Sequence, residues 1–232
     1  MSAIGIATVG QSPRDDVVPQ MRRIWGEEIP VVERGALDAF DSSDLDELVA
    51  RGDTILVSRL RDGSEIRLDA HRAESLLQRA AEYLSEAGCD PIIILCTGSS
   101  PVTIPGVRTV LPRELYPRIL RGLTRGPIGV MVPAATQQSA ALELFGDHFE
   151  RVVTAHASPY DFPRDRTAFF EAAARFRGSG VDLIGMNCLG YGEDMAAFVA
   201  EHSGIPCVPA SSAVAHSVSL LADRDRFAGT EG

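Results

Sequence analysis

Two stretches of the sequence each combine a buried strand with a cysteine at its carboxyl end. Ile92–Leu95 is a run of four apolar residues without alternation, which is typical of a strand buried on both faces of a parallel sheet. Cys96 ends this run, and Thr-Gly-Ser-Ser follows. Cys188 repeats the arrangement after the mainly apolar stretch Val181–Met186, which includes Asp182, and before a glycine-containing loop. Since ligands of open α/β sheets bind at the carboxyl ends of strands, we expect both thiols at a ligand site.

The pattern around the two cysteines indicates an internal duplication. Ile128–Val132 echoes the opening strand Ile4–Val9, and each begins a series of alternating strand and helix patterns that leads to one of the cysteine strands. The first series is longer and contains an expected hairpin over about 53–69. The chain is therefore predicted to be an α/β protein of two similar units with mainly parallel sheets.

The hairpin is predicted from Asp62-Gly63, a dipeptide typical of a two-residue type I′ turn. That register places Arg59 and Arg61 on one face with apolar neighbours, namely Val57, Ile66 and Leu68. Two interpretations stay open: a solvated hairpin tip, or an arm that brings the carboxylate-binding Arg59 to the cleft.

Composition excludes several classes of partner. The chain has 232 residues and a net charge of −10, which argues against nucleic acid but leaves room for a small anionic substrate bound by local arginines. The N-terminus lacks the features of a signal peptide and no apolar run is long enough to span a bilayer, so we expect a cytoplasmic protein without membrane contact. The histidines are scattered and no C-x-x-C pair occurs, so we expect no metal site.

Two thiols that face one cleft can perform acid–base chemistry without a cofactor. One thiol removes a proton from a carbon next to a carboxylate, and the other returns a proton from the opposite face. Backbone N–H groups at a strand end lower the pKa of a thiol and favour the thiolate. With Thr97, Ser99, Ser100 and Asn187, they are candidates to hold the substrate carboxylate and its enolate-like intermediate. For Cys89 and Cys207 we expect inert packing, which is the common role of a free cysteine.

Four motifs resemble the AroM family over nearly the whole chain: Thr8 to Arg14, Arg59 to Gly63, Leu95 to Gly98, and Asn187 to Tyr191. That family is similar to the aspartate/glutamate racemase superfamily. The resemblance implies two pseudo-symmetric Rossmann-like α/β domains, an active site in the cleft between them with one cysteine from each, and cofactor-independent chemistry. It also implies that the C-terminal helix packs on the first domain. We therefore expect domains over 1–122 and 123–209, with helix 210–222 completing the first.

The match to glutamate racemases is incomplete beside both cysteines. Those enzymes have Asn-Thr after the first cysteine and Thr-His after the second, where this chain has Thr97-Gly98 and Leu189-Gly190. The amino-group and carboxylate contacts of an amino-acid racemase are therefore not carried over. The stretch that begins at Cys188 looks closer to the Cys-Ala-Gly-Met of hydantoin racemases.

Further candidates follow the strands that open each unit. Gln11, Ser12 and Arg14 lie where the superfamily places substrate-binding groups, and Arg14 is a candidate to clamp a carboxylate. The alternative is that Ser12 caps a helix beginning at Pro13 and Arg14 is solvated in its first turn. The matching loop of the second unit makes Thr136 a weaker candidate, with Gln137 and Gln138. Tyr191 either covers the site or packs beneath its loop.

These observations predict a cofactor-independent racemase or epimerase of a small carboxylate-like substrate, with Cys96 and Cys188 as paired acid and base. The alternatives are a single-cysteine isomerase or decarboxylase of the same superfamily, and a non-catalytic metabolite-binding protein. The expected substrate-binding residues are Gln11, Ser12, Arg14, Arg59, Thr97, Gly98, Ser99, Thr136, Asn187, Leu189, Gly190 and Tyr191. Self-association into a homo-oligomer is left open, with the hairpin as a plausible contact.

Overall fold

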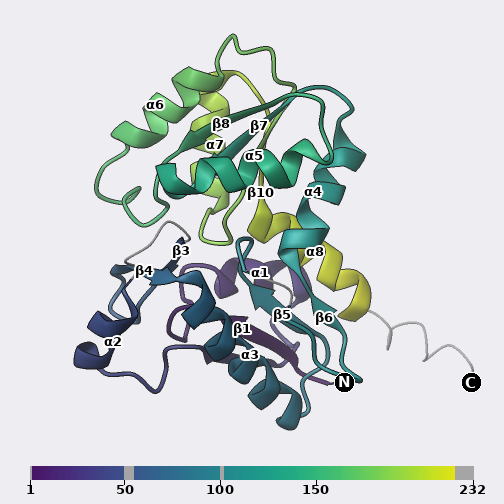
Figure 1. Ribbon diagram of the computed structural model, residues 1–232. Coiled ribbons are helices and arrows are strands. Elements are labelled where there is room, and N and C mark those ends of the chain that lie inside the picture. The colour runs from purple at the N-terminus through teal and green to yellow at the C-terminus, as the bar shows by residue number, and fades with distance from the viewer. Residues whose placement is uncertain (1, 50–54, 100–101, 223–232) are drawn as a thin grey trace, which may run out of the picture.

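The computed structural model describes residues 2–49, 55–99 and 102–222, and it contains a four-stranded parallel sheet in each half of the chain (Figure 1). Two expectations lie partly or wholly outside these residues: the start of the hairpin predicted over about 53–69, and the candidate Ser100. The predicted fold class, an α/β protein with two parallel sheets, is confirmed.

The first sheet has the strand order β2-β1-β5-β6. Strand β5 is apolar at every position because both of its faces are covered: Ile93 and Leu95 pack in one core with helix α1, and Ile92 and Ile94 pack in another with α3. The elements of this unit are β1 (Ile4–Thr8), α1 (Val18–Trp25), β2 (Val31–Gly35), α2 (Ser42–Leu48), α3 (Ala70–Glu86), β5 (Ile92–Leu95) and β6 (Thr109–Val110).

The second sheet repeats the topology of the first. Its order, β8-β7-β9-β10, corresponds strand for strand to β2-β1-β5-β6, and all of its neighbouring pairs are parallel. This correspondence confirms the two pseudo-symmetric units that the sequence pattern predicted. The elements are β7 (Ile128–Val132), the short 3₁₀ helix η1 (Ala135–Gln137), α5 (Gln138–Gly146), β8 (Val152–His156), α6 (Thr167–Phe176), β9 (Leu183–Met186), α7 (Glu193–Ser203) and β10 (Cys207–Pro209).

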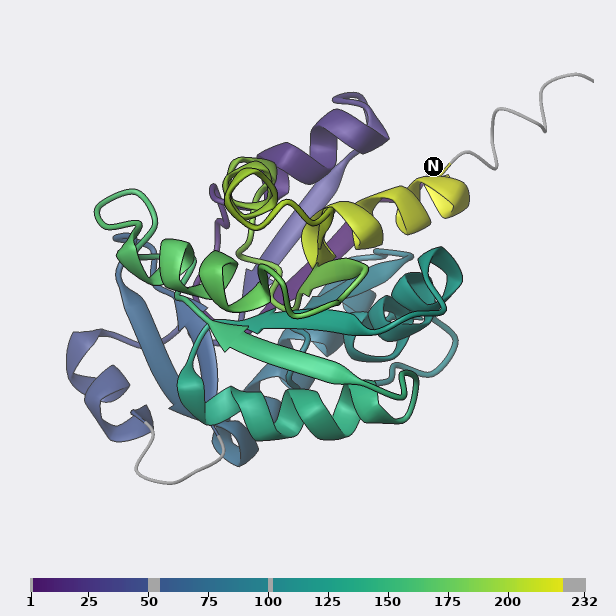
Figure 2. The ribbon, with the colours of Figure 1, turned by 90° about the horizontal axis from the view of Figure 1, so that it is seen from above.

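Two helices join the units. Helix α8 (Ala210–Ala222) packs beside α1, where the Trp25 indole N–H donates to the carbonyl of Ala215 at 2.9 Å (Figure 2). Helix α4 (Pro112–Leu123) packs against the second sheet, and the Tyr116 hydroxyl donates to the carbonyl of Val208. One hydrophobic core includes side chains from both sheets, α4 and α8. These contacts hold the carboxyl ends of the two sheets toward each other.

The inserted hairpin, β3 (Ile55–Arg59) and β4 (Glu65–Asp69), has a different register from the predicted one. The Leu60 N–H donates to the carbonyl of Ser64 at 2.9 Å, so the loop contains three residues and not two. A shift of one residue moves every side chain of a strand to the opposite face. Leu56 and Ser58 therefore share the buried face, and the predicted placement of Arg59 beside Ile66 and Leu68 is wrong.

The first helix begins later than predicted. Helix α1 starts at Val18, and Ser12 is not its cap. The Ser12 hydroxyl instead donates to a carboxylate oxygen of Asp38 at 2.6 Å, and its N–H donates to the other at 2.7 Å. The five residues between Ser12 and Val18 form a loop that carries Arg14 and Asp16 toward the gap between the units.

Candidate active site

The two cysteine loops have the same local geometry. Cys96 directly follows β5, and Cys188 lies two residues beyond β9. In each loop the N–H of a glycine two residues onward donates to the cysteine sulfur, from Gly98 at 3.3 Å and from Gly190 at 3.4 Å. The loops also touch across the units, since the Thr97 hydroxyl donates to the carbonyl of Asn187 at 3.0 Å. The duplication therefore extends to the hydrogen bonds of the two thiols.

Both thiols line one cavity between the units, which encloses about 380 Å³ including its opening toward solvent. The cavity walls combine apolar side chains with a few polar groups from both units and from the hairpin. The lining consists of Arg14, Leu56, Val57, Ser58, Leu95, Cys96, Thr97, Gly98, Pro133, Gln137, Tyr160, Asn187, Cys188, Leu189 and Gly190.

Burial keeps both cavity thiols protonated. It raises the pKa of Cys188 to about 12, although the Gly190 N–H and the nearby charge of Arg14 act in the opposite direction. Burial likewise raises the pKa of Cys96, against hydrogen bonds from Gly98 and Ser99. The expected N–H groups are thus present, but the expected preference for thiolate is wrong because desolvation outweighs them. Each thiolate also disfavours the other, since a charge on Cys96 raises the pKa of Cys188.

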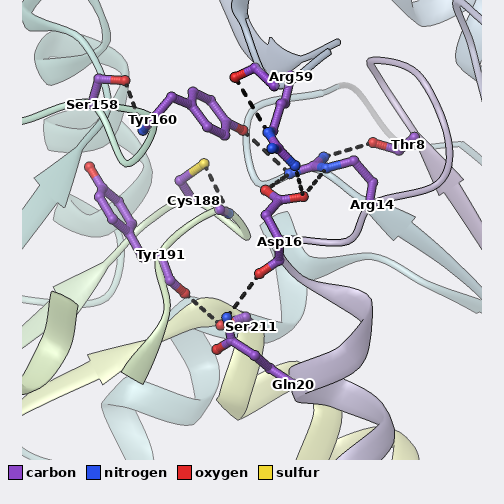
Figure 3. Close-up of polar contacts among 12 residues, drawn as sticks. Thr8, Arg14, Asp16, Gln20, Arg59, Ser158, Tyr160, Cys188, Tyr191 and Ser211 are labelled. Carbon is purple, nitrogen blue, oxygen red and sulfur yellow. Dashed lines mark hydrogen bonds and ion pairs between the residues drawn. The ribbon is translucent and has the colours of Figure 1, made fainter. Parts of the chain in front are cut away.

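Arg14 is buried at the cavity wall, with 3% of its surface exposed. Its Nε and Nη2 atoms each donate to one carboxylate oxygen of Asp16 at 2.8 Å, and Nη1 donates to the Thr8 hydroxyl at 2.9 Å (Figure 3). Burial alone would raise the pKa of Asp16, but the hydrogen bonds and charge of Arg14 lower it. The bidentate face expected to clamp a substrate carboxylate is therefore occupied by Asp16, and the expected solvated position is wrong.

Arg59 and Tyr160 complete the group around Asp16. The Arg59 guanidinium lies 3.5 Å from the Asp16 carboxylate and does not line the cavity. Tyr160 does line it, and its hydroxyl lies 3.4 Å from Arg14 Nη2 (Figure 3). Burial raises the pKa of Tyr160 far above its usual range. Tyr160 was not among the predicted site residues, although it follows the carboxyl end of β8, where ligand groups are expected.

The other predicted substrate-binding residues divide between the cavity and its surroundings. Gln11 and Ser12 make hydrogen bonds to other residues of the first unit. The Gln11 carboxamide accepts from the Arg61 N–H at 3.0 Å, and the Ser12 hydroxyl donates to Asp38. The Tyr191 hydroxyl donates to the carbonyl of Ala157 at 2.7 Å beneath the Cys188 loop. The cavity lining includes Arg14, Thr97, Gly98, Asn187, Leu189 and Gly190, and it does not include Gln11, Ser12, Arg59, Ser99, Thr136 or Tyr191.

The hairpin forms one wall of the cavity. Leu56, Val57 and Ser58 of β3 line it, and the strand is attached to both units. On the first unit, the Gln11 N–H donates to the carbonyl of Arg59 at 3.2 Å. On the second, the Gln137 carboxamide donates to the carbonyl of Ile55 at 3.3 Å. The hairpin thus contributes apolar surface to the cavity, while Arg59 contacts Asp16.

The described part of the chain contains no group of three or more histidine, cysteine, aspartate or glutamate side chains able to hold a metal ion. Within the same residues, no helix combines the length and apolar character needed to cross a bilayer.

Comparison with solved structures identifies the same fold in several racemases and in a decarboxylase. The glutamate racemase from Francisella tularensis, solved in complex with D-glutamate, is 14% identical with a TM-score of 0.66, and the match covers 100% of this chain and 84% of that one. The allantoin racemase from Pseudomonas fluorescens is 14% identical, with a TM-score of 0.61 and coverage of 99% and 92%. An arylmalonate decarboxylase is 16% identical, with a TM-score of 0.56 and coverage of 99% and 94%.

At this level of identity the similarity establishes the two-domain fold of these enzymes and not a reaction. A search among curated proteins gave no match. The family assignment comes from the sequence itself, because residues 4–221 match the family described as AroM protein. The chain therefore belongs to the AroM family and has the two-domain fold of the aspartate, glutamate and allantoin racemases.

Proposed function

We propose that this protein is a cofactor-independent racemase or epimerase of a small carboxylate-like substrate, with Cys96 and Cys188 as paired acid and base. The observation that carries the proposal is that the two thiols line the same cavity from equivalent positions of the two units. The fold shared with racemases and a decarboxylase supports the reaction class.

The proposed reaction needs one thiolate and one thiol. The thiolate takes the proton from the carbon next to the carboxylate, so an S–H bond forms, a C–H bond breaks and the electron pair delocalises into the carboxylate. The other thiol then gives its proton to the opposite face and becomes the thiolate. At the intermediate both cysteines are thiols and the extra negative charge is on the substrate. Before and after the exchange the pair carries one negative charge, and the thiolate has moved from one cysteine to the other, which is the form that acts on the opposite enantiomer.

The contacts of the two sulfurs suit this exchange. Gly98 and Gly190 each direct an N–H group at one sulfur, which stabilises whichever thiolate is present. The charge of Arg14 acts on Cys188. Since burial disfavours the thiolate of both residues, the working form is scarce in the empty cavity at neutral pH.

The decisive experiment follows exchange of the substrate hydrogen in D₂O, together with loss of optical rotation, over a panel of chiral small carboxylates. Cys96→Ser and Cys188→Ser are each expected to lower racemisation by about 10²–10⁴-fold, which is the usual contribution of acid–base catalysis. Cys207→Ser is the matched control, because Cys207 is also half-buried but does not line the cavity.

The alternatives give different results in the same assay. If Cys96→Ser keeps full turnover, the two-thiol mechanism is wrong and a single-cysteine isomerase or decarboxylase takes its place. A non-catalytic binding protein would show no exchange with any substrate, and both serine variants would keep the affinity for ligand.

A further inference from the structure

The cavity has an unusual charge balance for a site that would bind an amino acid. Among the described residues that line it, Arg14 is the one charged side chain, and no aspartate or glutamate is present. In the resting cavity the two thiols add no negative charge, because burial keeps them protonated and the thiolate of the proposed reaction is scarce. A substrate ammonium group would therefore enter a lining that has one positive charge and no negative charge.

The carboxylates that act electrostatically on Tyr160 from outside the lining are already paired. Both oxygens of Asp16 accept from Arg14 at 2.8 Å, and Arg59 lies 3.5 Å from the same carboxylate (Figure 3). Glu65 accepts from the Ser158 hydroxyl with one oxygen and from Arg67 at 2.8 Å with the other. Arg14 and Arg59 share the carboxylate of Asp16, and Glu33 accepts from the Arg14 backbone N–H at 2.7 Å, so the charges on this side of the cavity are already paired with one another.

The remaining lining groups are neutral. Oδ1 of Asn187 is buried without a hydrogen-bond partner in the described structure, so it can accept from a neutral donor such as a hydroxyl group. The apolar part of the lining comes from three directions: the hairpin, the two cysteine strands and the β7 loop. It consists of Leu56, Val57, Leu95, Pro133 and Leu189.

We propose that the substrate is a small carboxylate with a single negative charge whose substituents at the reacting carbon are uncharged, and that α-ammonium acids are excluded. This rests on the proposed function, which places the reacting carbon between the two thiols. A buried charge without a partner is strongly disfavoured, whereas a hydroxyl or alkyl group meets neutral and apolar groups here. Arg14, the one charged side chain among the described lining residues, offers the anion a positive neighbour.

Binding of matched ligands tests the proposal without requiring turnover. We would titrate the protein calorimetrically with 2-aminobutanoate, 2-hydroxybutanoate and 2-methylbutanoate, and with the corresponding phenyl series of phenylglycine, mandelate and 2-phenylpropanoate. In each series the hydroxy and methyl members are expected to bind at least about tenfold more tightly than the ammonium member. Equal or tighter binding of the ammonium member overturns the proposal, as does failure of all members to bind.

A pair of neighbouring glutamines provides a charge test. Gln137 lines the cavity, while Gln138 accepts from the Thr154 hydroxyl at 3.0 Å outside the lining. Gln137→Glu places a carboxylate in the lining, so the preference for the hydroxy acid over the amino acid is expected to fall at least about fivefold. Gln138→Glu adds the same charge elsewhere and should leave the preference unchanged. An equal effect of the two substitutions contradicts the argument from the lining.

The proposed reaction and the proposed substrate class can fail separately. If the hydroxy or methyl acids bind selectively but their α-hydrogen does not exchange in D₂O, racemisation is wrong and the substrate class stands. If an α-amino acid binds more tightly and exchanges its α-hydrogen, the substrate class is wrong and the two-thiol reaction stands.

Discussion

Desolvation of the half-buried Cys188 leads to a quantitative prediction about its reactivity. Burial raises its pKa from 9.0 to about 12. At pH 8 an ordinary thiol is about one-tenth thiolate, and a thiol with a pKa near 12 is about one ten-thousandth thiolate, which is a difference of about a thousandfold. A more basic thiolate is a better nucleophile, and this offsets about twentyfold of that difference in an exchange reaction. Cys188 is therefore expected to react about fiftyfold more slowly than the same cysteine in the unfolded chain.

The assay uses methyl methanethiosulfonate, a reagent small enough for a confined cavity. Samples are quenched in acid, and modification of the peptide containing Cys188 is followed by mass spectrometry between pH 7 and 10. The rate is expected to rise about tenfold with each pH unit and to show no plateau, because the range lies below the pKa. The urea-unfolded chain is the reference and should level off near pH 9.

Restricted access to the cavity lowers the modification rate by the same factor at every pH. The dependence of the rate on pH therefore distinguishes restricted access from a raised pKa. A plateau between pH 7 and 9 in the folded protein would mean that Cys188 is already a thiolate. In that case the Gly190 N–H and the charge of Arg14 would outweigh desolvation, contrary to what is expected here.

Three further predictions concern stability, each measured by urea unfolding. In Gly10→Ala the new Cβ would lie 2.2 Å from the carbonyl oxygen of Arg59 in the hairpin, so the free energy of unfolding should fall by about 1–3 kcal/mol. Gly122→Ala is the control, because Gly122 lies in helix α4 with open space around it, and the free energy of unfolding should rise by about 0.5–1 kcal/mol. Equal effects of the two substitutions would contradict the close approach at Gly10. Asp16→Asn removes the carboxylate partner of a buried arginine and should cost about 3 kcal/mol, while the exposed Asp15→Asn should change stability by less than about 0.5 kcal/mol. The pKa of Cys188 is higher in the folded protein than in the unfolded chain, so the protonated thiol contributes fully to the free energy of unfolding below pH 9. Above pH 9 this contribution is lost by about 1 kcal/mol per pH unit. Cys188→Ala should therefore make the free energy of unfolding fall less steeply with pH.

Much of the architecture could be predicted from local sequence patterns. The unalternating run Ile92–Leu95 predicted a strand covered on both faces, because such a strand has no solvent side on which polar residues are favourable. The repeated succession of strand, helix and cysteine strand predicted two similar units, and their sheets have the same strand order. Ligands of open α/β sheets bind at the carboxyl ends of strands, and this rule predicted Cys96 and Cys188, which line one cavity. Applied to β8, the same rule would have included Tyr160.

The partners of the charged residues could not be predicted in the same way. Arg14 was expected either to bind substrate or to face solvent, and the fold instead buries it against Asp16. Ser12 looked like a helix cap, but Asp38, distant in sequence, binds both its hydroxyl and its N–H. The hairpin loop has three residues, one more than predicted, and this shifts the strand register by one residue. Arg59 therefore lies on the opposite face of the hairpin from Ile66 and Leu68.

The sequence by itself determined the two α/β units and the positions of the two cysteines, because strand burial, strand ends and glycine loops depend on residues close together in the chain. The tertiary structure decided which of the candidate residues reach the cavity and which charges are already paired there. It also decided the ionisation of the thiols, since the pKa of Cys188 depends on how much water the two units and the hairpin exclude together. Desolvation and long-range ion pairs are properties of the assembled fold, and no local pattern encodes them.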